Sequence, residues 1–234
     1  MNVFAMDTSS LTATVAVLCD DKLLGEYTIS NKLTHSQTVL PMTEELLERL
    51  GMKLSDIDVF AVCVGPGSFT GLRIGMATVK TFAQALGKPV VGVSSLDAIA
   101  YNISYAEGYT VCPIIDSRRN EVYNALYKDG EKILFDRHIY IDDLLEELAD
   151  TKTIFLGDAA ILHKAKIENC KNNNWKIAPQ HLILPSASTV AYCAYNKALN
   201  GNVDDAYTLN PVYLRKSQAE RELEEKNKNM EVAK

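Results

Sequence analysis

Residues 59–71 read VFAVCVGPGSFTG, the most distinctive stretch of the chain. The six apolar residues Val59–Val64 predict a buried strand. The Gly-Pro-Gly turn that follows leads through Ser68 into a helix, which we expect to end near Leu86 because Gly87 comes next. A strand that passes through a glycine-rich turn into a helix is typical of α/β proteins. It places a helix N-terminus where an anion such as phosphate can bind.

Two interpretations of this turn stay open. The turn lacks the Gly-Lys-Ser/Thr ending of a P-loop, and its third glycine, Gly71, falls one residue too late for a dinucleotide-binding fingerprint. Pro66 also removes one of the N–H donors that would surround an anion. The first interpretation is therefore a tight strand-to-helix turn with Ser68 or Thr70 as the helix N-cap. The second is contact with a nucleotide.

The segments on either side extend the α/β pattern. Before the stretch we expect three short strands and a helix stopped by Gly51, and after it a strand and a third helix. This order, β-β-β-α-β-α-β-α, predicts a mixed sheet packed with helices. The strands are predicted at Asn2–Met6, Thr12–Leu18, Lys22–Ile29 and Val90–Val93, and the helices at Ser36–Leu50 and from Ser95 onward.

The second half of the chain begins with a partial echo of the first. The strand Val111–Ile115 ends in Asp116-Ser117, as the first strand ends in Asp7-Thr8-Ser9, and a hairpin follows in both places. The echo predicts an α/β fold of two related halves, with the two aspartate turns meeting in a cleft that could hold phosphates and a metal ion. Further strands are predicted at Glu121–Tyr127, Lys132–Phe135 and Thr153–Leu156, and helices at Asp142–Ala149, Ala159–Cys170 and Ser188–Leu199.

On this basis we divide the chain into three parts. Residues 1–104 form the first half, residues 105–214 a smaller second half, and residues 215–234 a charged tail. The tail holds 11 charged residues in 20, which is typical of a solvated helix or a disordered segment. It could also become ordered on a partner.

The composition limits the function classes. Of 234 residues, 47% are apolar and 23% charged, which excludes collagen-like, disordered and coiled-coil chains. The net charge of −6 argues against a broad basic face, so if an RNA is bound we expect a partner to supply much of the positive charge. No stretch approaches the ~20 apolar residues of a membrane span, and the five scattered cysteines form no Cys-x-x-Cys pair. We therefore expect a cytoplasmic protein that does not enter a membrane.

The sequence offers no catalytic or metal-binding set. The four histidines lie far apart and have no histidine partner at i+4, whereas a zinc site needs several ligands. Asp7 and Asp116 could bind magnesium if they converge, but aspartates at strand ends are also common turn residues. Ser9 or Ser68 as a nucleophile would need a nearby base, and the sequence points to none. We expect no catalytic residue, metal or cofactor in this chain.

The first two helices carry more apolar surface than one core contact requires. In the first helix the apolar residues spread over roughly 160°, at about 100° per residue, which is wider than a simple core stripe. In the second helix, Ile74, Phe82 and Ala85 extend the apolar arc beyond the main face. Either helices of a partner or the other half of this protein must cover the surplus.

Six motifs together resemble the TsaB family, also called YeaZ, of bacterial tRNA threonylcarbamoyladenosine biosynthesis proteins. The resemblance covers residues 1 to about 220. It implies the actin-like, sugar kinase and heat-shock ATPase fold, in agreement with the two related halves predicted above. The motifs are MDTSS (6–10), THSQTVLPMTEELL (34–47), VCVGPGSFTGLRIG (62–75), VVGVSSLDAIA (90–100), IIDSRRNEVY (114–123) and PVYLRKSQAE (211–220).

The resemblance implies a role in a complex. Members pair with the paralogous TsaD, which transfers a threonylcarbamoyl group from threonylcarbamoyl-AMP to an adenosine of tRNA, and the ATPase TsaE completes the complex. TsaB is regarded as a non-catalytic scaffold and activator. ATP or ADP and metal are therefore expected on the partner subunits, and tRNA through the complex. The TsaD-type motif Asn-His-x-x-Gly-His has its metal ligands where this sequence has Ser95 and Ile99, and Ile99 cannot bind a metal.

The resemblance also implies that the first two helices form the heterodimer surface, as a four-helix bundle with the equivalent TsaD helices. Without the partner, such a surface is expected to pair with a second copy as a homodimer. From helix angles we expect the exposed contacts at Leu40, Thr43, Leu47, Ile74, Thr78 and Phe82.

An enzyme is the alternative hypothesis. It would be a nucleotide hydrolase or transferase that works through Asp7, Asp116 and the turn at residues 65–71. This hypothesis requires an open, phosphate-sized cleft at Asp7, Ser9 and Ser68. A metalloprotease is a third hypothesis, against which the missing histidines argue.

Overall fold

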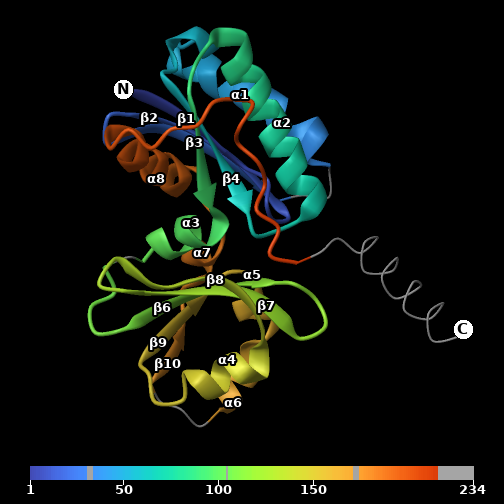
Figure 1. Ribbon diagram of the computed structural model, residues 1–234, viewed down its shortest axis with the longest axis vertical. Helices are drawn as coiled ribbons and strands as arrows, with labels where there is room; N and C mark the ends of the chain where they lie inside the picture. The colour runs from blue at the N-terminus through green and yellow to red at the C-terminus, as the bar shows by residue number, and fades with distance from the viewer. Residues whose placement is uncertain (31–33, 104, 171–173, 216–234) are drawn as a thin grey trace, which may run out of the picture.

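Two α/β halves are stacked along the long axis of the molecule (Figure 1). The computed structural model describes residues 1–30, 34–103, 105–170 and 174–215. The tail predicted at residues 215–234 therefore lies outside the described residues, except for Arg215. Within the described part of the chain, no helix combines the length and the apolar character needed to cross a membrane.

The first half follows the predicted order of elements, and the second half repeats its beginning. The first half contains β1 (Asn2–Asp7), β2 (Thr12–Cys19), β3 (Lys22–Ser30), α1 (His35–Leu50), the 3-10 helix η1 (Leu54–Asp56), β4 (Val59–Gly65), α2 (Phe69–Leu86), β5 (Val90–Ser94) and α3 (Ser95–Tyr101). The later elements are β6 (Thr110–Asp116), β7 (Glu121–Lys128), β8 (Glu131–Tyr140), α4 (Ile141–Glu147), β9 (Thr153–Leu156), α5 (Asp158–Leu162), α6 (Lys164–Asn169), β10 (Trp175–Ile177), α7 (Gln180–Ile183) and α8 (Ala187–Leu199).

The two sheets share one topology. The first sheet has the order β3-β2-β1-β4-β5, and the second, read from its other edge, has β8-β7-β6-β9-β10. In both, the central strand pairs antiparallel with the next strand and parallel with the strand after the first helix. Asp7 and Asp116 end the equivalent strands β1 and β6. The predicted fold of two related α/β halves is confirmed.

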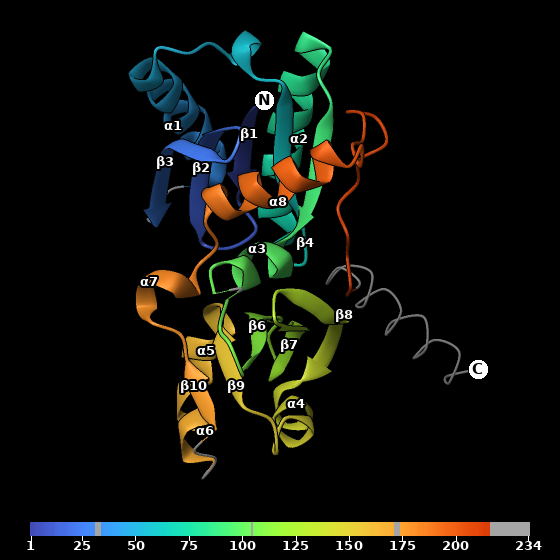
Figure 2. The same ribbon diagram turned by 90° about the vertical axis from the view of Figure 1, so that its left-hand side faces the viewer.

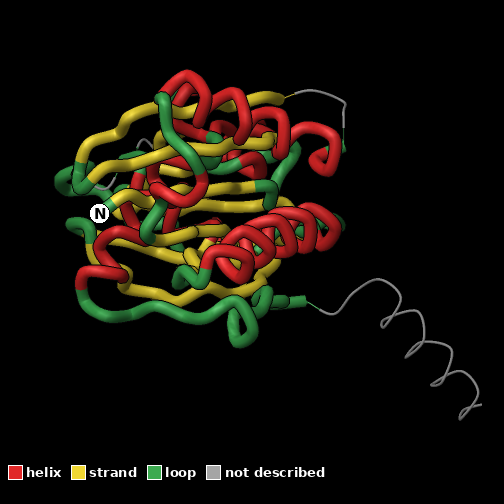
Figure 3. The backbone as a smooth tube through the Cα atoms, turned by 90° about the horizontal axis from the view of Figure 1, so that it is seen from above, coloured by secondary structure: helices red, strands yellow, loops and turns green. Residues whose placement is uncertain are grey.

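Helices cover both faces of the first sheet, as the red tubes on either side of the yellow strands illustrate (Figure 3). Side chains alternate between the faces, as the pleat of a strand requires. Phe4 of β1 and Phe60 of β4 point to the face covered by α1 and α2. Their neighbours Ala5 and Ala61 point to the opposite face, which α8 covers. Strands buried on both faces explain why Val59–Val64 is apolar without alternation.

The second sheet has helices α4, α5 and α6 on one face and α3 and α7 on the face toward the first half (Figure 2). Several details differ from the prediction. The single helix expected at Ala159–Cys170 is divided at His163 into α5 and α6, and β8 extends five residues beyond Phe135 to Tyr140. The short elements β10 and α7 were not predicted.

The chain returns to the first half at its end. The small apolar residues Val190, Ala191 and Ala194 of α8 pack on the first sheet. Beyond α8, Asp204 pairs with Val90, and the backbone N–H of Val212 donates to the carbonyl of Val64 at 2.8 Å. The assignment of residues 105–214 to the second half therefore needs correction, because residues 187–212 pack on the first.

Candidate partner surface and interdomain cleft

The glycine-rich turn packs against the end of β1. Ser68 is the N-cap of α2, and its hydroxyl accepts a hydrogen bond from the N–H of Gly71 at 3.3 Å. The N–H of Ser68 donates to the carbonyl of Ser9 at 2.7 Å. A Cβ atom on Gly67 would lie 2.5 Å from the Ser9 carbonyl oxygen, and one on Gly71 only 2.0 Å from that of Thr8. These glycines permit close contact between two backbone segments, as the tight-turn interpretation requires.

The Asp7 carboxyl group is sealed inside the protein. Asp7 is completely buried, and its Oδ1 atom accepts a hydrogen bond from the N–H of Ser9 at 2.7 Å. Its Oδ2 atom has no hydrogen-bond partner among the described residues. Burial raises the pKa of Asp7, because a charged carboxylate loses its hydration there. Asp7 is therefore an interior group with a raised pKa and not an accessible ligand.

The cleft beside Ser9 is nearly closed. Its remaining cavity has a volume of about 10 Å³ and is lined by Ser9, Ile99, Ile115 and Leu184, among others. That is room for about one water molecule, whereas pockets for ligands of drug or cofactor size measure roughly 300–1,000 Å³. Ser68 is exposed and used as a helix cap. Neither Asp7 nor Ser68 lines this cavity, so the three residues of the enzyme hypothesis do not share it.

The second aspartate turn makes its own contacts. Asp116 uses Oδ1 to accept the N–H of Arg118 at 3.0 Å, and its own N–H donates to Asp158 at the same distance. The two predicted ligands Asp7 and Asp116 therefore serve separate turns. Across the described residues, no group of three or more histidine, cysteine, aspartate or glutamate side chains is arranged to hold a metal ion.

The positions that correspond to the TsaD-type metal ligands lie in the interior. Ser95 is completely buried and Ile99 is 1% exposed. Ile99 packs with Ile115 and Leu156 in the cluster between α3 and the second sheet. Apolar packing thus occupies the place where the resemblance puts a metal site.

A half-buried polar network, the interdomain clamp, joins the two halves. Lys132 of β8 forms ion pairs with Asp97 of α3 at 2.6 Å and with Asp136 of β8 at 2.5 Å. Tyr127 also donates to Asp97 at 2.5 Å, and Ser94 donates to Asp136 at 2.6 Å. Burial lowers the pKa of Lys132, but the hydrogen bonds to Asp136 and Asp97 outweigh it and the pKa is raised. Sequence reasoning missed this clamp, because its members are far apart in the chain.

The accessible concave feature of the predicted partner surface is the α1–α2 groove. It has a volume of about 580 Å³. Leu40, at its edge, is 50% exposed, and Phe82 is half-buried at its floor. The residues that line it are Leu40, Thr43, Glu44, Leu47, Glu48, Met52, Leu54 and Phe82. Four of the six predicted contact residues are in this set.

Of the six contacts expected to be exposed, Leu40 is exposed, three are half-buried and two are buried. Thr43 is 3% and Leu47 is 6% exposed, while Ile74 and Thr78 are half-buried. Leu47 belongs to the core between α1 and the first sheet, and the Thr43 hydroxyl donates to the carbonyl of Val39 at 2.7 Å. The buried arc of α1 is wider than the predicted inner stripe. Its outer face carries glutamates beside Leu40.

Comparisons with known proteins give a consistent result. The family model TsaD, tRNA N6-adenosine threonylcarbamoyltransferase, matches residues 22–223. The chain is 35% identical over 226 residues to the tRNA threonylcarbamoyladenosine biosynthesis protein TsaB of Bacillus subtilis (strain 168), covering 94% of this chain and 96% of that protein. A crystal structure from Pseudomonas aeruginosa, of an uncharacterized protein with similarity to peptidase YeaZ, matches with a TM-score of 0.77 at 30% identity over 92% of this chain and 99% of that chain.

A more distant structure shares the fold alone. The activator of the 2-hydroxyisocaproyl-CoA dehydratase from Clostridium difficile, with bound ADPNP, matches with a TM-score of 0.54 at 11% identity. The match covers 91% of this chain and 100% of that chain. The two-halved architecture is therefore also that of a nucleotide-binding protein, although the cleft is nearly closed in this chain.

Proposed function

The chain belongs to the TsaB family, within the wider family that the TsaD model describes, and on this basis we propose that it is a non-catalytic scaffold subunit in the biosynthesis of threonylcarbamoyladenosine on tRNA. Its partner in this proposal is a TsaD-type subunit, joined by a TsaE-type ATPase, in the cytoplasm. Nucleotide and metal belong to those partners, and tRNA is bound through the complex. Alone, the chain forms a homodimer through the same surface.

The observation that carries the proposal is the contrast between the accessible α1–α2 groove and the small cavity beside Ser9. The groove offers about 580 Å³ lined by apolar and acidic side chains, while the cleft beside Ser9 offers about 10 Å³. On the neighbouring face of α2, the small residues Ala77, Thr81 and Ala85 are exposed. Small residues let another helix approach closely, so this face suits a helical partner.

The proposal is tested with one exposed leucine at the groove and one elsewhere. Leu40→Glu adds a charge at the groove edge without disturbing the core, because Leu40 is 50% exposed. Leu162→Glu is the matched control, since Leu162 of α5 is 62% exposed in the second half. Leu47 and Phe82 are poorer choices because both pack against the core of the first half.

Wild type, Leu40→Glu and Leu162→Glu are mixed with the TsaD of the same organism and measured by size-exclusion chromatography with light scattering. We expect a heterodimer with wild type and control, and at least tenfold weaker association for Leu40→Glu. Normal binding of Leu40→Glu would show that the groove is not the partner surface. Failure of the wild type to bind would reject the scaffold function, and nucleotide turnover would then be assayed.

A further inference from the structure

Arginine is concentrated at one place on this acidic chain. The sequence has seven arginines and a net charge of −6. Four of the seven lie near residues 213–215, the last described residues, which connect α2 with the turn between β6 and β7 (residues 117–120). We name Arg73, Arg118, Arg119 and Arg215 the arginine cluster. We propose that the arginine cluster is a contact surface for the phosphate backbone of RNA, an inference that rests on the proposed role in tRNA modification.

The final segment brings the arginine cluster together. Figure 1 shows this segment running along α2 and ending beside the second half. The Arg73 Nε atom donates to the Tyr213 hydroxyl at 3.1 Å. Two residues on, Arg215 pairs with Glu121 at 2.8 Å and its guanidinium donates to the Ser117 carbonyl. Since two residues span at most about 7 Å, α2 and the β6–β7 turn are held next to each other.

The turn that carries Arg118 and Arg119 has a fixed and unusual backbone. Arg118, Arg119 and Asn120 all have left-handed conformations, with φ values of 69°, 59° and 60°. Residues other than glycine adopt this region rarely and at a cost, and they retain it where surrounding contacts hold them. Here the Ser117 N–H donates to the Glu121 carbonyl at 3.0 Å, and the Ile141 N–H donates to that of Asn120 at 2.9 Å. The turn therefore presents its two arginines from a preorganised frame.

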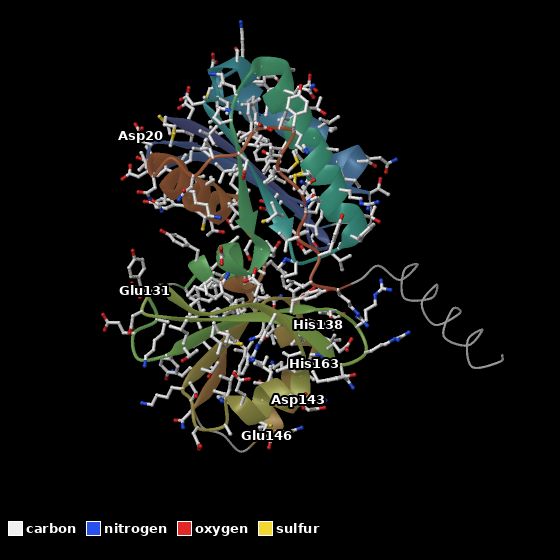
Figure 4. All side chains as sticks on the ribbon, viewed as in Figure 1. Asp20, Glu131, His138, Asp143, Glu146 and His163 are labelled. Atoms are coloured by element: carbon white, nitrogen blue, oxygen red, sulfur yellow. The ribbon has the colours of Figure 1, made fainter. Side chains whose placement is uncertain are left out.

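The side chains of Arg118 and Arg119 are available to a ligand. Both are exposed, and neither forms an ion pair with any carboxylate among the described residues. The nearby acidic groups are already engaged: Glu121 binds Arg215, and Asp116 accepts the backbone N–H of Arg118. His138, labelled in Figure 4, lies 2.8 Å from the Ser117 hydroxyl and 3.5 Å from Glu121. The four arginines outnumber the carboxylates of Asp116, Glu121 and Asp158 that lie near the turn.

Arg73 is oriented from the other side by aromatic rings. The Phe69 and Tyr213 rings are stacked with centroids 4.6 Å apart, and the Arg73 guanidinium lies 3.9 Å from the Phe69 centroid. Phe69 and Tyr213 remain 37% and 40% exposed. Arginine binds phosphate through a planar fork of donors, which favours it over lysine at a phosphate contact. These contacts carry no base information, so the surface should bind tRNAs of different sequence alike.

The test removes the two free arginines of the turn without changing its backbone. Arg118→Asn/Arg119→Asn uses the residue type that tolerates a left-handed conformation. The matched control, Lys152→Asn/Lys164→Asn, removes two charges from exposed lysines elsewhere in the second half. Binding of a fluorescent tRNA transcript is measured by anisotropy from 50 to 300 mM KCl, for the isolated chain and for its complex with TsaD.

For each phosphate contact that the arginine variant loses, we expect tRNA binding to weaken about eightfold at 0.1 M salt. The slope of log affinity against log salt concentration should decrease in magnitude by about 0.7–0.9 per lost contact. The control should bind as wild type does. Equal weakening of both variants, or of neither, would overturn the proposal. So would normal tRNA binding combined with failure to bind TsaD, which would identify a protein-binding surface. If the wild type does not bind TsaD, the proposed function fails, yet the titrations of the isolated chain still decide this inference.

Discussion

Replacing Gly71 by alanine tests whether the glycine-rich turn exists for backbone contact. The added Cβ would lie 2.0 Å from the carbonyl oxygen of Thr8 and 3.2 Å from its carbonyl carbon. Both atoms belong to the backbone, so no side-chain rotation relieves the clash. The end of β1 would have to move away from α2 by more than about 1 Å to restore ordinary contact in this close-packed interior.

The cost follows from what such a movement breaks. Overpacking alone costs about 1–3 kcal/mol. The movement also strains the buried hydrogen bond of 2.7 Å from the Thr8 hydroxyl to the Gly71 carbonyl, and the Ser68 cap on the Gly71 N–H. We therefore expect Gly71→Ala to lose about 3–5 kcal/mol of unfolding free energy, a large part of the stability of a typical domain.

Urea unfolding followed by circular dichroism measures this loss. Gly87→Ala is the control at the other end of α2, since Gly87 has a φ of 62° and no atom within 4 Å of an added Cβ. Its cost should be only the left-handed penalty of about 1–2 kcal/mol. A Gly71→Ala variant as stable as Gly87→Ala would refute the packing explanation. Loss of nucleotide binding at unchanged stability would instead favour a phosphate-binding turn.

Two further predictions concern titratable groups away from the open surface. Burial raises the folded-state pKa of Asp7, so its contribution to stability is present below the unfolded pKa and is lost as pH rises through the folded pKa. Asp7→Asn should remove this pH-dependent loss, so the melting temperature of wild type minus that of the variant should fall with rising pH. A difference that stays constant with pH would contradict the assignment. Lys132→Met leaves Asp97 and Asp136 without their cation and should cost about 2–4 kcal/mol. In a double-mutant cycle with Asp97→Asn, measured by urea unfolding, the double variant should lose less unfolding free energy than the sum of the two single variants. Purely additive losses would reject the interdomain clamp.

The sequence predicted the first half well because its elements have strong local signals. The strand Val59–Val64 and the helix stops at Gly51 and Gly87 depend on a few neighbouring residues, and the structure has them at the expected places. β10 was missed for the opposite reason. It is three residues long and is defined by its parallel pairing with β9, a contact between distant segments that no local pattern reveals.

The candidate site was harder to predict because exposure depends on tertiary packing. Helix angles identified the wide apolar arc of α1 and predicted that Leu40 is exposed, but they also predicted exposure for Thr43 and Leu47, which are buried. The interdomain clamp and the arginine cluster also join residues that are far apart in the chain. The pair Arg118-Arg119 was visible in the sequence, but its left-handed backbone was not.

The return of the chain to its beginning has a consequence for its synthesis. Val3 and Ala5 of β1 are synthesised long before the helix that covers their face, α8, which ends at Leu199. The first sheet therefore cannot complete its core until α8 has been synthesised, whereas all strands of the second sheet precede α8. A nascent chain paused before α8 exposes an apolar sheet face and becomes a substrate for chaperones. A stop codon within α8 should accordingly be as damaging as an early one.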